Sequence, residues 1–154
     1  MDTFAAKLMG STAVALVTAG ISVPHAPALI RPGTVTLSAT TKVHTHVDVG
    51  ARGRSPGDVD VYRFVLYNKR IQARPLGHAD MVCTTITGST QNCNATYFLP
   101  RGELVVSGVI GSRLIYVVAV VGGTDLYNNV HGTLTVTSVR RTPARDLVVF
   151  RLTV

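Results

Sequence analysis

Apolar and polar residues alternate with a period of two along most of the chain after residue 28. In "DVDVYRFVLY" the side chains of Tyr62, Phe64 and Leu66 share one face of an extended segment, and Arg63 lies on the other. The last segment repeats this pattern, with Phe150 on its apolar face. A period of two is typical of strands with one buried face. Beyond residue 28 no stretch keeps a helical period, so the sequence predicts an all-β domain.

Gly, Pro, Asn and Ser divide the alternating segments into eight predicted strands. These span residues 34–49, 58–67, 77–86, 92–99, 103–110, 114–121, 130–139 and 146–154. Gly122 and Gly123 are predicted to form the tight turn before the seventh strand. Short strands with close turns favour a sandwich or a barrel, and their apolar faces suit a barrel with an apolar interior. Segment 114–121 is apolar on both faces, which indicates a covered outer wall such as a subunit contact.

The first 28 residues differ from the rest of the chain. Lys7 precedes an apolar run over 8–23, and Ala26-Pro27-Ala28 follows it, which is the pattern of a secretory signal peptide. A native N-terminal helix or the leader of a cytoplasmic protein is the alternative. We therefore expect a leader over 1–28, a single β-barrel domain over 29–154, and a secreted or cell-envelope protein. Gly and Ser interrupt the apolar run, so no membrane span is predicted.

The two cysteines support export. Cys83 and Cys93 flank "TTITGSTQN", which predicts a strand, a polar turn and a strand. Cysteines on either side of such a hairpin can face each other at bridging distance, and a disulfide suits an oxidising compartment. Two buried free thiols are the alternative.

The charge of the chain is strongly basic, with 15 Lys and Arg against 8 Asp and Glu and a formal net charge of +7. Such a balance raises the possibility of a nucleic-acid partner. The cations are spread along the chain, however, there is no Trp, and few aromatic residues lie among them. We expect a solvated basic surface and no nucleic-acid partner.

Four segments in fixed order resemble the allene oxide cyclase and dirigent-like barrel family. They are "SPGDVDVYRFVLYN", "GHADMVC", "NATYFLPRGELVVSG" and "VVGGTDLYNNVHGTLTV". The matched positions are Gly57-Asp58, Gly77 with Cys83, Gly108, and the run from Gly122 to Gly132, within residues 34–154. The resemblance implies an eight-stranded antiparallel barrel, often a homo-oligomer such as a dimer or trimer, whose pocket holds a hydrophobic small molecule.

The function that the resemblance implies is a cofactor-independent cyclase or isomerase of natural-product biosynthesis. Cycloaddition or spiro-cyclisation of a polyketide-like intermediate is an example. Such a catalyst holds its substrate in a folded, reactive conformation and needs few polar groups. The alternative is a secreted barrel without catalysis that binds a small apolar ligand or serves as a structural oligomer.

The predicted catalytic residues are Tyr62, as hydrogen-bond donor, and Asp48, as the assisting acid. The predicted substrate-binding wall is apolar and aromatic, and consists of Phe64, Leu66, Met81, Tyr97, Leu104, Tyr116 and Phe150. Plain packing is the alternative role for each tyrosine. Phe64 stands where the plant cyclases of the family carry a pocket Asn, which argues against allene oxide cyclisation itself.

Two other chemistries are weaker. His44, His46 and Asp48 alternate along the first predicted strand and, with His78 or His131, could form a metal site. A polar strand surface explains the same pattern, and we predict no metal. The sequence lacks a Gly-x-Ser-x-Gly motif, so a serine hydrolase is not expected.

Overall fold

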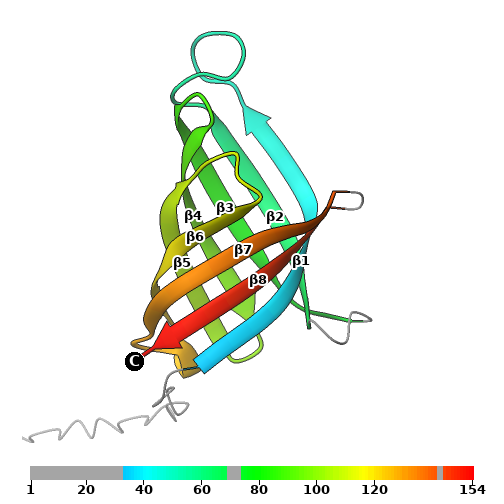
Figure 1. The fold of residues 1–154 in the computed structure, drawn as a ribbon, viewed down its shortest axis with the longest axis vertical. Helices are drawn as coiled ribbons and strands as arrows, with labels where there is room; N and C mark the ends of the chain where they lie inside the picture. Colours follow the sequence, from blue (N-terminus) through cyan, green and yellow to red (C-terminus); the bar gives the residue numbers. More distant parts are fainter. Residues whose placement is uncertain (1–32, 69–73, 142–143) are drawn as a thin grey trace, which may run out of the picture.

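The computed structural model describes residues 33–68, 74–141 and 144–154, and the predicted leader over 1–28 lies outside them. Eight strands pair in chain order with antiparallel neighbours, and β8 pairs with β1 to close a barrel (Figure 1). The strands are β1 (Gly33–Val47), β2 (Val59–Asn68), β3 (Pro75–Thr87), β4 (Thr90–Leu99), β5 (Gly102–Ile110), β6 (Ile115–Gly123), β7 (His131–Arg141) and β8 (Ala144–Thr153). The predicted eight-stranded antiparallel barrel is confirmed.

The inner face of β1 changes parity part-way along the strand. Its pairing with β2 shifts register between Thr41 and Val43, which marks a β-bulge. Before the bulge the odd-numbered Leu37 faces the core and is buried. Beyond it the even-numbered His44 and His46 reach a carboxylate on the inner face of β2. One extra residue therefore places both imidazoles on the same face of the sheet as Asp60.

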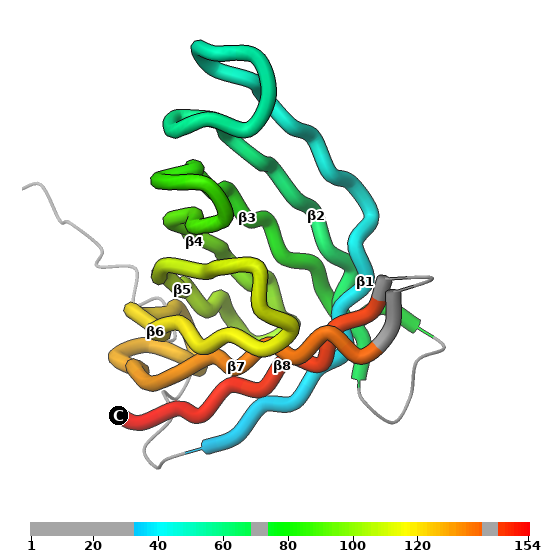
Figure 2. The backbone as a smooth tube through the Cα atoms, turned by 45° about the horizontal axis from the view of Figure 1, so that its top comes forward, coloured from blue at the N-terminus to red at the C-terminus, as the bar shows by residue number. Residues whose placement is uncertain are grey.

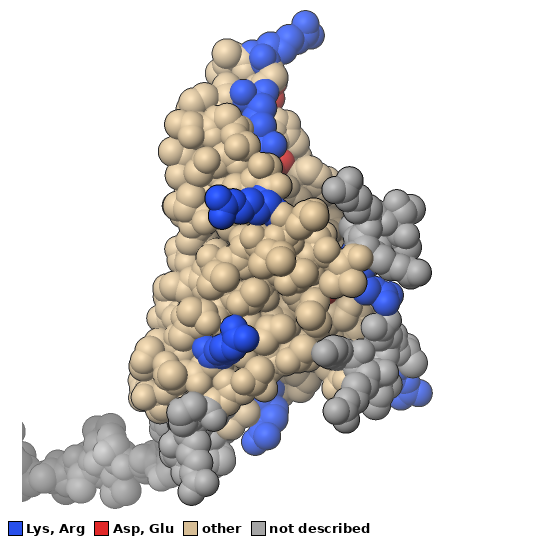
Figure 3. All heavy atoms as spheres, viewed as in Figure 1, with Lys and Arg blue, Asp and Glu red and all other residues tan. Residues whose placement is uncertain are grey.

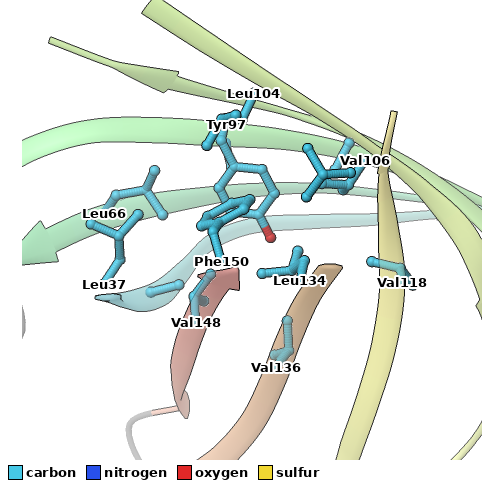
Figure 4. Close-up of a cluster of buried hydrophobic side chains, with 14 of the residues drawn as sticks. Leu37, Leu66, Tyr97, Leu104, Val106, Val118, Leu134, Val136, Val148 and Phe150 are labelled. Carbon is cyan, nitrogen blue, oxygen red and sulfur yellow. The ribbon is translucent and has the colours of Figure 1, made fainter. Parts of the chain in front are cut away.

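The end of the barrel away from the β1–β2 loop is filled by side chains. Its core includes Leu37, Leu66, Tyr97, Leu104, Val106, Val118, Leu134, Val136, Val148 and Phe150 (Figure 4). The rings of Tyr97 and Phe150 meet edge to face, with centroids 4.9 Å apart. The short helix η1 (Asp125–Tyr127) lies at this end, and its Tyr127 is buried. We call this the closed end.

The opposite end is open and oblique. β1 to β4 rise well beyond β6, β7 and β8, so part of their inner face has no wall opposite it (Figures 1 and 2). The side chains of His44 and His46 lie on this overhang and are 47% and 40% exposed. We call this end the mouth.

The connection between β6 and β7 differs from the predicted glycine turn. Gly122 and Gly123 are the last residues of β6 and pair with β5. The positive φ angles fall instead on Asp125, at 52°, and Asn129, at 62°. Gly123 is needed for space, because a Cβ there would press on the carbonyl oxygen of Glu103. Close approach between strands, rather than turn geometry, explains this glycine.

The predicted disulfide is present. Cys83 of β3 and Cys93 of β4 are register partners, and their sulfur atoms are 2.03 Å apart. Both residues are buried and face the barrel interior. The bond is compatible with an extracellular protein.

The outer surface carries scattered cations and one apolar strand. Lys and Arg lie in separate groups on the face drawn in Figure 3. On β6 the side chains of Ile115, Val117 and Val121 are each more than half exposed in the single chain. Among the described residues no helix is long and apolar enough to cross a membrane.

Candidate functional site

A buried carboxylate organises the mouth of the barrel. Asp60 of β2 is 3% exposed. Its Oδ1 accepts hydrogen bonds from His44 Nε2 and His46 Nδ1, each at 2.9 Å. Its Oδ2 accepts one from Gln91 Nε2 at 2.6 Å. Two imidazoles of β1 and an amide of β4 therefore converge on one acid of β2.

The protonation of this cluster follows from its hydrogen bonds. Burial opposes ionisation of Asp60, but the hydrogen bonds from His44, His46 and Gln91 outweigh it and lower its pKa to about 2. An ionised carboxylate only accepts, so each imidazole carries a proton on the nitrogen that faces Asp60. In the neutral tautomers His44 Nδ1 and His46 Nε2 are then free to take up a proton.

The β1–β2 loop brings a cation to the same acid. Asp58 is fully buried and accepts hydrogen bonds from the backbone N–H groups of Ser55, at 2.6 Å, and Val49, at 2.9 Å. These bonds lower the pKa of Asp58 and anchor the loop. The guanidinium of Arg54 consequently lies 3.6 Å from Asp60 Oδ2.

Aromatic rings line the wall between the mouth and the core. Tyr62 stacks on His44, with ring centroids 4.3 Å apart and planes within 3° of parallel. On its other side it stacks on Phe64, at 5.8 Å. Burial and the charge of Asp60 raise the pKa of Tyr62, so its phenol remains a hydrogen-bond donor at neutral pH. The three rings therefore form one continuous stack beside the apolar interior.

A small cavity lies inside the barrel wall. It is lined by Met81, Cys93, Ala95, Tyr97, Val106, Ile110, Tyr116, Val118 and Leu134. The cavity volume is about 10 Å³, which is room for about one water molecule. Burial raises the pKa of both Tyr97 and Tyr116, so both phenols stay protonated.

A second inward acid lies on β8. Asp146 lies on the same face of the strand as the buried Val148 and Phe150. Burial raises its pKa, and a hydrogen bond from Ser138 offsets part of that rise. Its negative charge in turn raises the pKa of Tyr116. Sequence reasoning did not single out this residue, although its position in the alternation of the last strand was visible.

The barrel wall is interrupted between β5 and β6. Their pairing ends at Ser107 and Ala119, although β5 continues to Ile110 and β6 begins at Ile115. A groove of about 430 Å³ lies here, lined by Val109, Ile110, Gly111, Arg113, Ile115, Tyr116 and Val117. Ile110 and Tyr116 border both the groove and the inner cavity.

The predicted site residues fall into three groups. Three residues belong to the packed core and are 0% exposed: Leu66, Leu104 and Phe150. The next group borders the mouth or the cavity, and consists of Tyr62, Phe64, Met81, Tyr97 and Tyr116. Asp48 lies beyond the end of β1, is exposed, and accepts a hydrogen bond from the Gly53 N–H at 3.2 Å.

The histidines separate into an inner pair and two distant residues. His44 and His46 both turn toward Asp60, whereas His78 stacks on Phe98 at 4.5 Å and His131 is exposed on β7. Within the described ranges no group of three or more His, Cys, Asp or Glu could hold a metal ion. The imidazole pair is arranged around an acid.

Comparison with known proteins supports the same architecture. No protein-family model matches the sequence, and no curated protein sequence does. Among solved structures, the chain is similar to a pyocyanin demethylase, with 25% identity, a TM-score of 0.69, and coverage of 79% of this chain and 100% of that one. It is also similar to the pterocarpan synthase dirigent protein GePTS1, with 16% identity, a TM-score of 0.63, and coverage of 86% and 95%.

The chain folds as a dirigent-like barrel.

A third similarity of this dirigent-like barrel is to the Diels Alderase AbmU from Streptomyces koyangensis, with 9% identity and a TM-score of 0.61. That match covers 78% of this chain and 63% of the Diels Alderase. The similar structures thus include enzymes that act on small molecules.

Proposed function

We propose that this dirigent-like barrel is a cofactor-independent enzyme that cyclises or isomerises a hydrophobic, polyketide-like small molecule by proton transfer at its mouth. The observation that carries the proposal is the buried Asp60 carboxylate, which holds two imidazoles, one of them stacked on Tyr62 beside an apolar interior. Acid–base groups and an apolar surface are thereby joined in one place.

His44 is the proposed acid–base residue. Asp60 holds its Nε2–H and stabilises the imidazolium that forms when Nδ1 takes a proton from the substrate. The Tyr62 hydroxyl donates a hydrogen bond to the substrate oxygen on which negative charge develops. The imidazolium then returns the proton to another atom of the same molecule. Substrate and product have the same composition, so no oxidant or reductant is consumed.

His46 and Gln91 are proposed as positioning residues. Each donates to the same carboxylate as His44 and fixes its orientation. Asp48 stays a predicted catalytic residue, but its exposed place beyond β1 makes Asp60 the better candidate. The proposal is supported by the similar Diels Alderase, which is a cyclising enzyme by name.

The test combines native mass spectrometry with chromatography. The protein is incubated with a panel of apolar polyenes and polyketide extracts, and we expect a product of unchanged mass and altered retention time. His44→Gln and Asp60→Asn should abolish its formation, whereas the exposed His131→Gln should not. Full activity in Asp60→Asn contradicts the proposed chemistry.

A second candidate function is demethylation of an aromatic heterocycle. It is supported by the similarity to pyocyanin demethylase at 25% identity over that whole chain. Incubation with pyocyanin, with and without an added electron acceptor, tests it directly. Loss of a methyl group from the compound would favour this candidate over isomerisation. Retention of an unchanged molecule would instead favour the binding protein without catalysis.

A further inference from the structure

Tyr97 is a buried residue whose hydroxyl makes no hydrogen bond with the described residues. Tyr97 of β4 is 5% exposed, and its ring packs edge to face on Phe150. Its hydroxyl oxygen points into the space between Phe150, Leu134 and Val118 (Figure 4). Tyr97 and Leu134 also line the small cavity. The hydroxyl is therefore aimed into the cavity.

Such a group calls for a partner. Buried hydroxyls in proteins are nearly always hydrogen-bonded, because loss of their hydration is costly. A tyrosine whose only need was to fill space could be replaced by Phe without that cost. The partner of Tyr97 is then a molecule that enters the barrel.

The chemistry of the cavity limits what that molecule presents. Tyr116 borders the same cavity with a second phenol, and the other lining side chains of this described set are uncharged. Both phenols stay protonated, since burial raises the pKa of each. A carboxylate or phosphate would enter without a lining cation to offset its desolvation. A neutral hydrogen-bond acceptor meets no such penalty.

We propose that the Tyr97 hydroxyl donates a hydrogen bond to the carbonyl oxygen of an apolar ketone-type ligand that enters the barrel oxygen first. The cavity has room for about one oxygen-sized atom, so the apolar body of the ligand lies toward Tyr62 and Phe64. The inference rests on the proposed function, because it gives the substrate class of the same site.

Matched ligands isolate the contribution of a single oxygen. 1-Tetralone and tetralin differ only by the carbonyl group, and their dissociation constants are measured by isothermal titration calorimetry. We expect the wild-type protein to prefer 1-tetralone about threefold to tenfold, the effect of one uncharged hydrogen bond. Tyr97→Phe keeps the ring that packs on Phe150 and should bind both compounds equally.

Controls separate this inference from the proposed function. Tyr127→Phe alters a buried phenol at the closed end and should keep the preference for 1-tetralone. His44→Gln should also keep it while losing turnover, so a failed catalytic assay with a Tyr97-dependent preference overturns only the proposed function. Binding of neither compound, or a preference that persists in Tyr97→Phe at unchanged melting temperature, overturns the inference. If a water molecule is the sole partner of Tyr97, the wild-type protein will bind 1-tetralone and tetralin equally, and that result also overturns the inference.

Discussion

Most of the polar contacts described at the mouth involve one carboxyl group, that of Asp60. Three side chains donate to it, and Arg54 lies close to its second oxygen. An acid this enclosed is stable as an anion only while those donors remain in place. The geometry of the mouth and the stability of the fold are therefore linked through the ionisation of one residue.

Acid titration should report this link. The pKa of Asp60 falls from 3.8 to about 2 on folding. Its ionised form therefore contributes fully to the free energy of unfolding above about pH 4, and this contribution is lost as pH falls through about 2. We expect the melting temperature of the wild type to fall between pH 4 and pH 2, and Asp60→Asn to remove part of that slope. The exposed Asp125→Asn serves as control. An identical slope in Asp60→Asn would contradict the assignment.

Tyr62→Phe tests the donor role of the phenol. The substitution keeps the stacking on His44 and Phe64 and removes only the hydroxyl. A hydrogen bond to a developing charge is worth about tenfold to a hundredfold in rate, so turnover should slow by that factor with little change in melting temperature. Steady-state kinetics of any substrate found in the screen give the measurement. Undiminished turnover would remove Tyr62 from the chemistry.

At the same scale, the sequence allowed part of the site to be predicted. The alternation that places Tyr62, Phe64 and Leu66 on one face extends back by two residues to Asp60, so this signal was available and missed. The facing of His44 was not readable, because the bulge after Thr41 leaves no mark in the period of apolar residues. One unpaired residue decides which side chains meet the acid.

At the scale of elements, the end of β6 shows that close contact with a neighbouring strand can require a glycine. Gly123 lies against the carbonyl oxygen of Glu103 in β5, whereas Gly122 beside it has open space where a Cβ would stand. The sequence predicted both glycines as turn residues from their type alone. Which of two adjacent glycines is required depends on the neighbouring strand, which no local pattern contains.

The two glycines form a matched pair for mutation. Gly123→Ala should reduce the free energy of unfolding by about 1–3 kcal/mol, because the added methyl group overfills a close contact. Gly122→Ala should leave it nearly unchanged. Chemical denaturation of both variants measures the difference. Equal losses in the two variants would show that backbone conformation, rather than space, matters here.

The whole molecule depends on pairing that runs round the barrel from β1 to β8. The closed antiparallel order was predictable from the period of two, the turns and the family resemblance, since the predicted strands carry at least one apolar face. How deeply the interior is filled was not predictable, because it depends on side chains from strands distant in sequence. Leu66 and Phe150, predicted to line a pocket, are part of the packed core. The predicted homo-oligomer stays a prediction that native mass spectrometry can test.

The disulfide is a covalent link between two neighbouring strands of the barrel, β3 and β4. Cys83 and Cys93 are separated by 10 positions, and a crosslink over a loop of this length stabilises by about 2–3 kcal/mol through the unfolded chain. We expect the double variant Cys83→Ala/Cys93→Ala to lose about that much in urea unfolding. Alkylation with and without reductant should differ by two thiols. Thiols that are alkylated without reductant would contradict the bond.

The pairing of β1 with β8 also has a practical consequence. Gly33 is the register partner of Leu152, so the first described residue and the last strand end side by side, away from the mouth (Figure 1). A linker attached after Val154 can therefore fix the protein to a sensor surface with His44 and Asp60 directed toward the solution. Immobilised in this way, the barrel would present its entrance to a flow of candidate compounds, and screening for its ligand could proceed without a label.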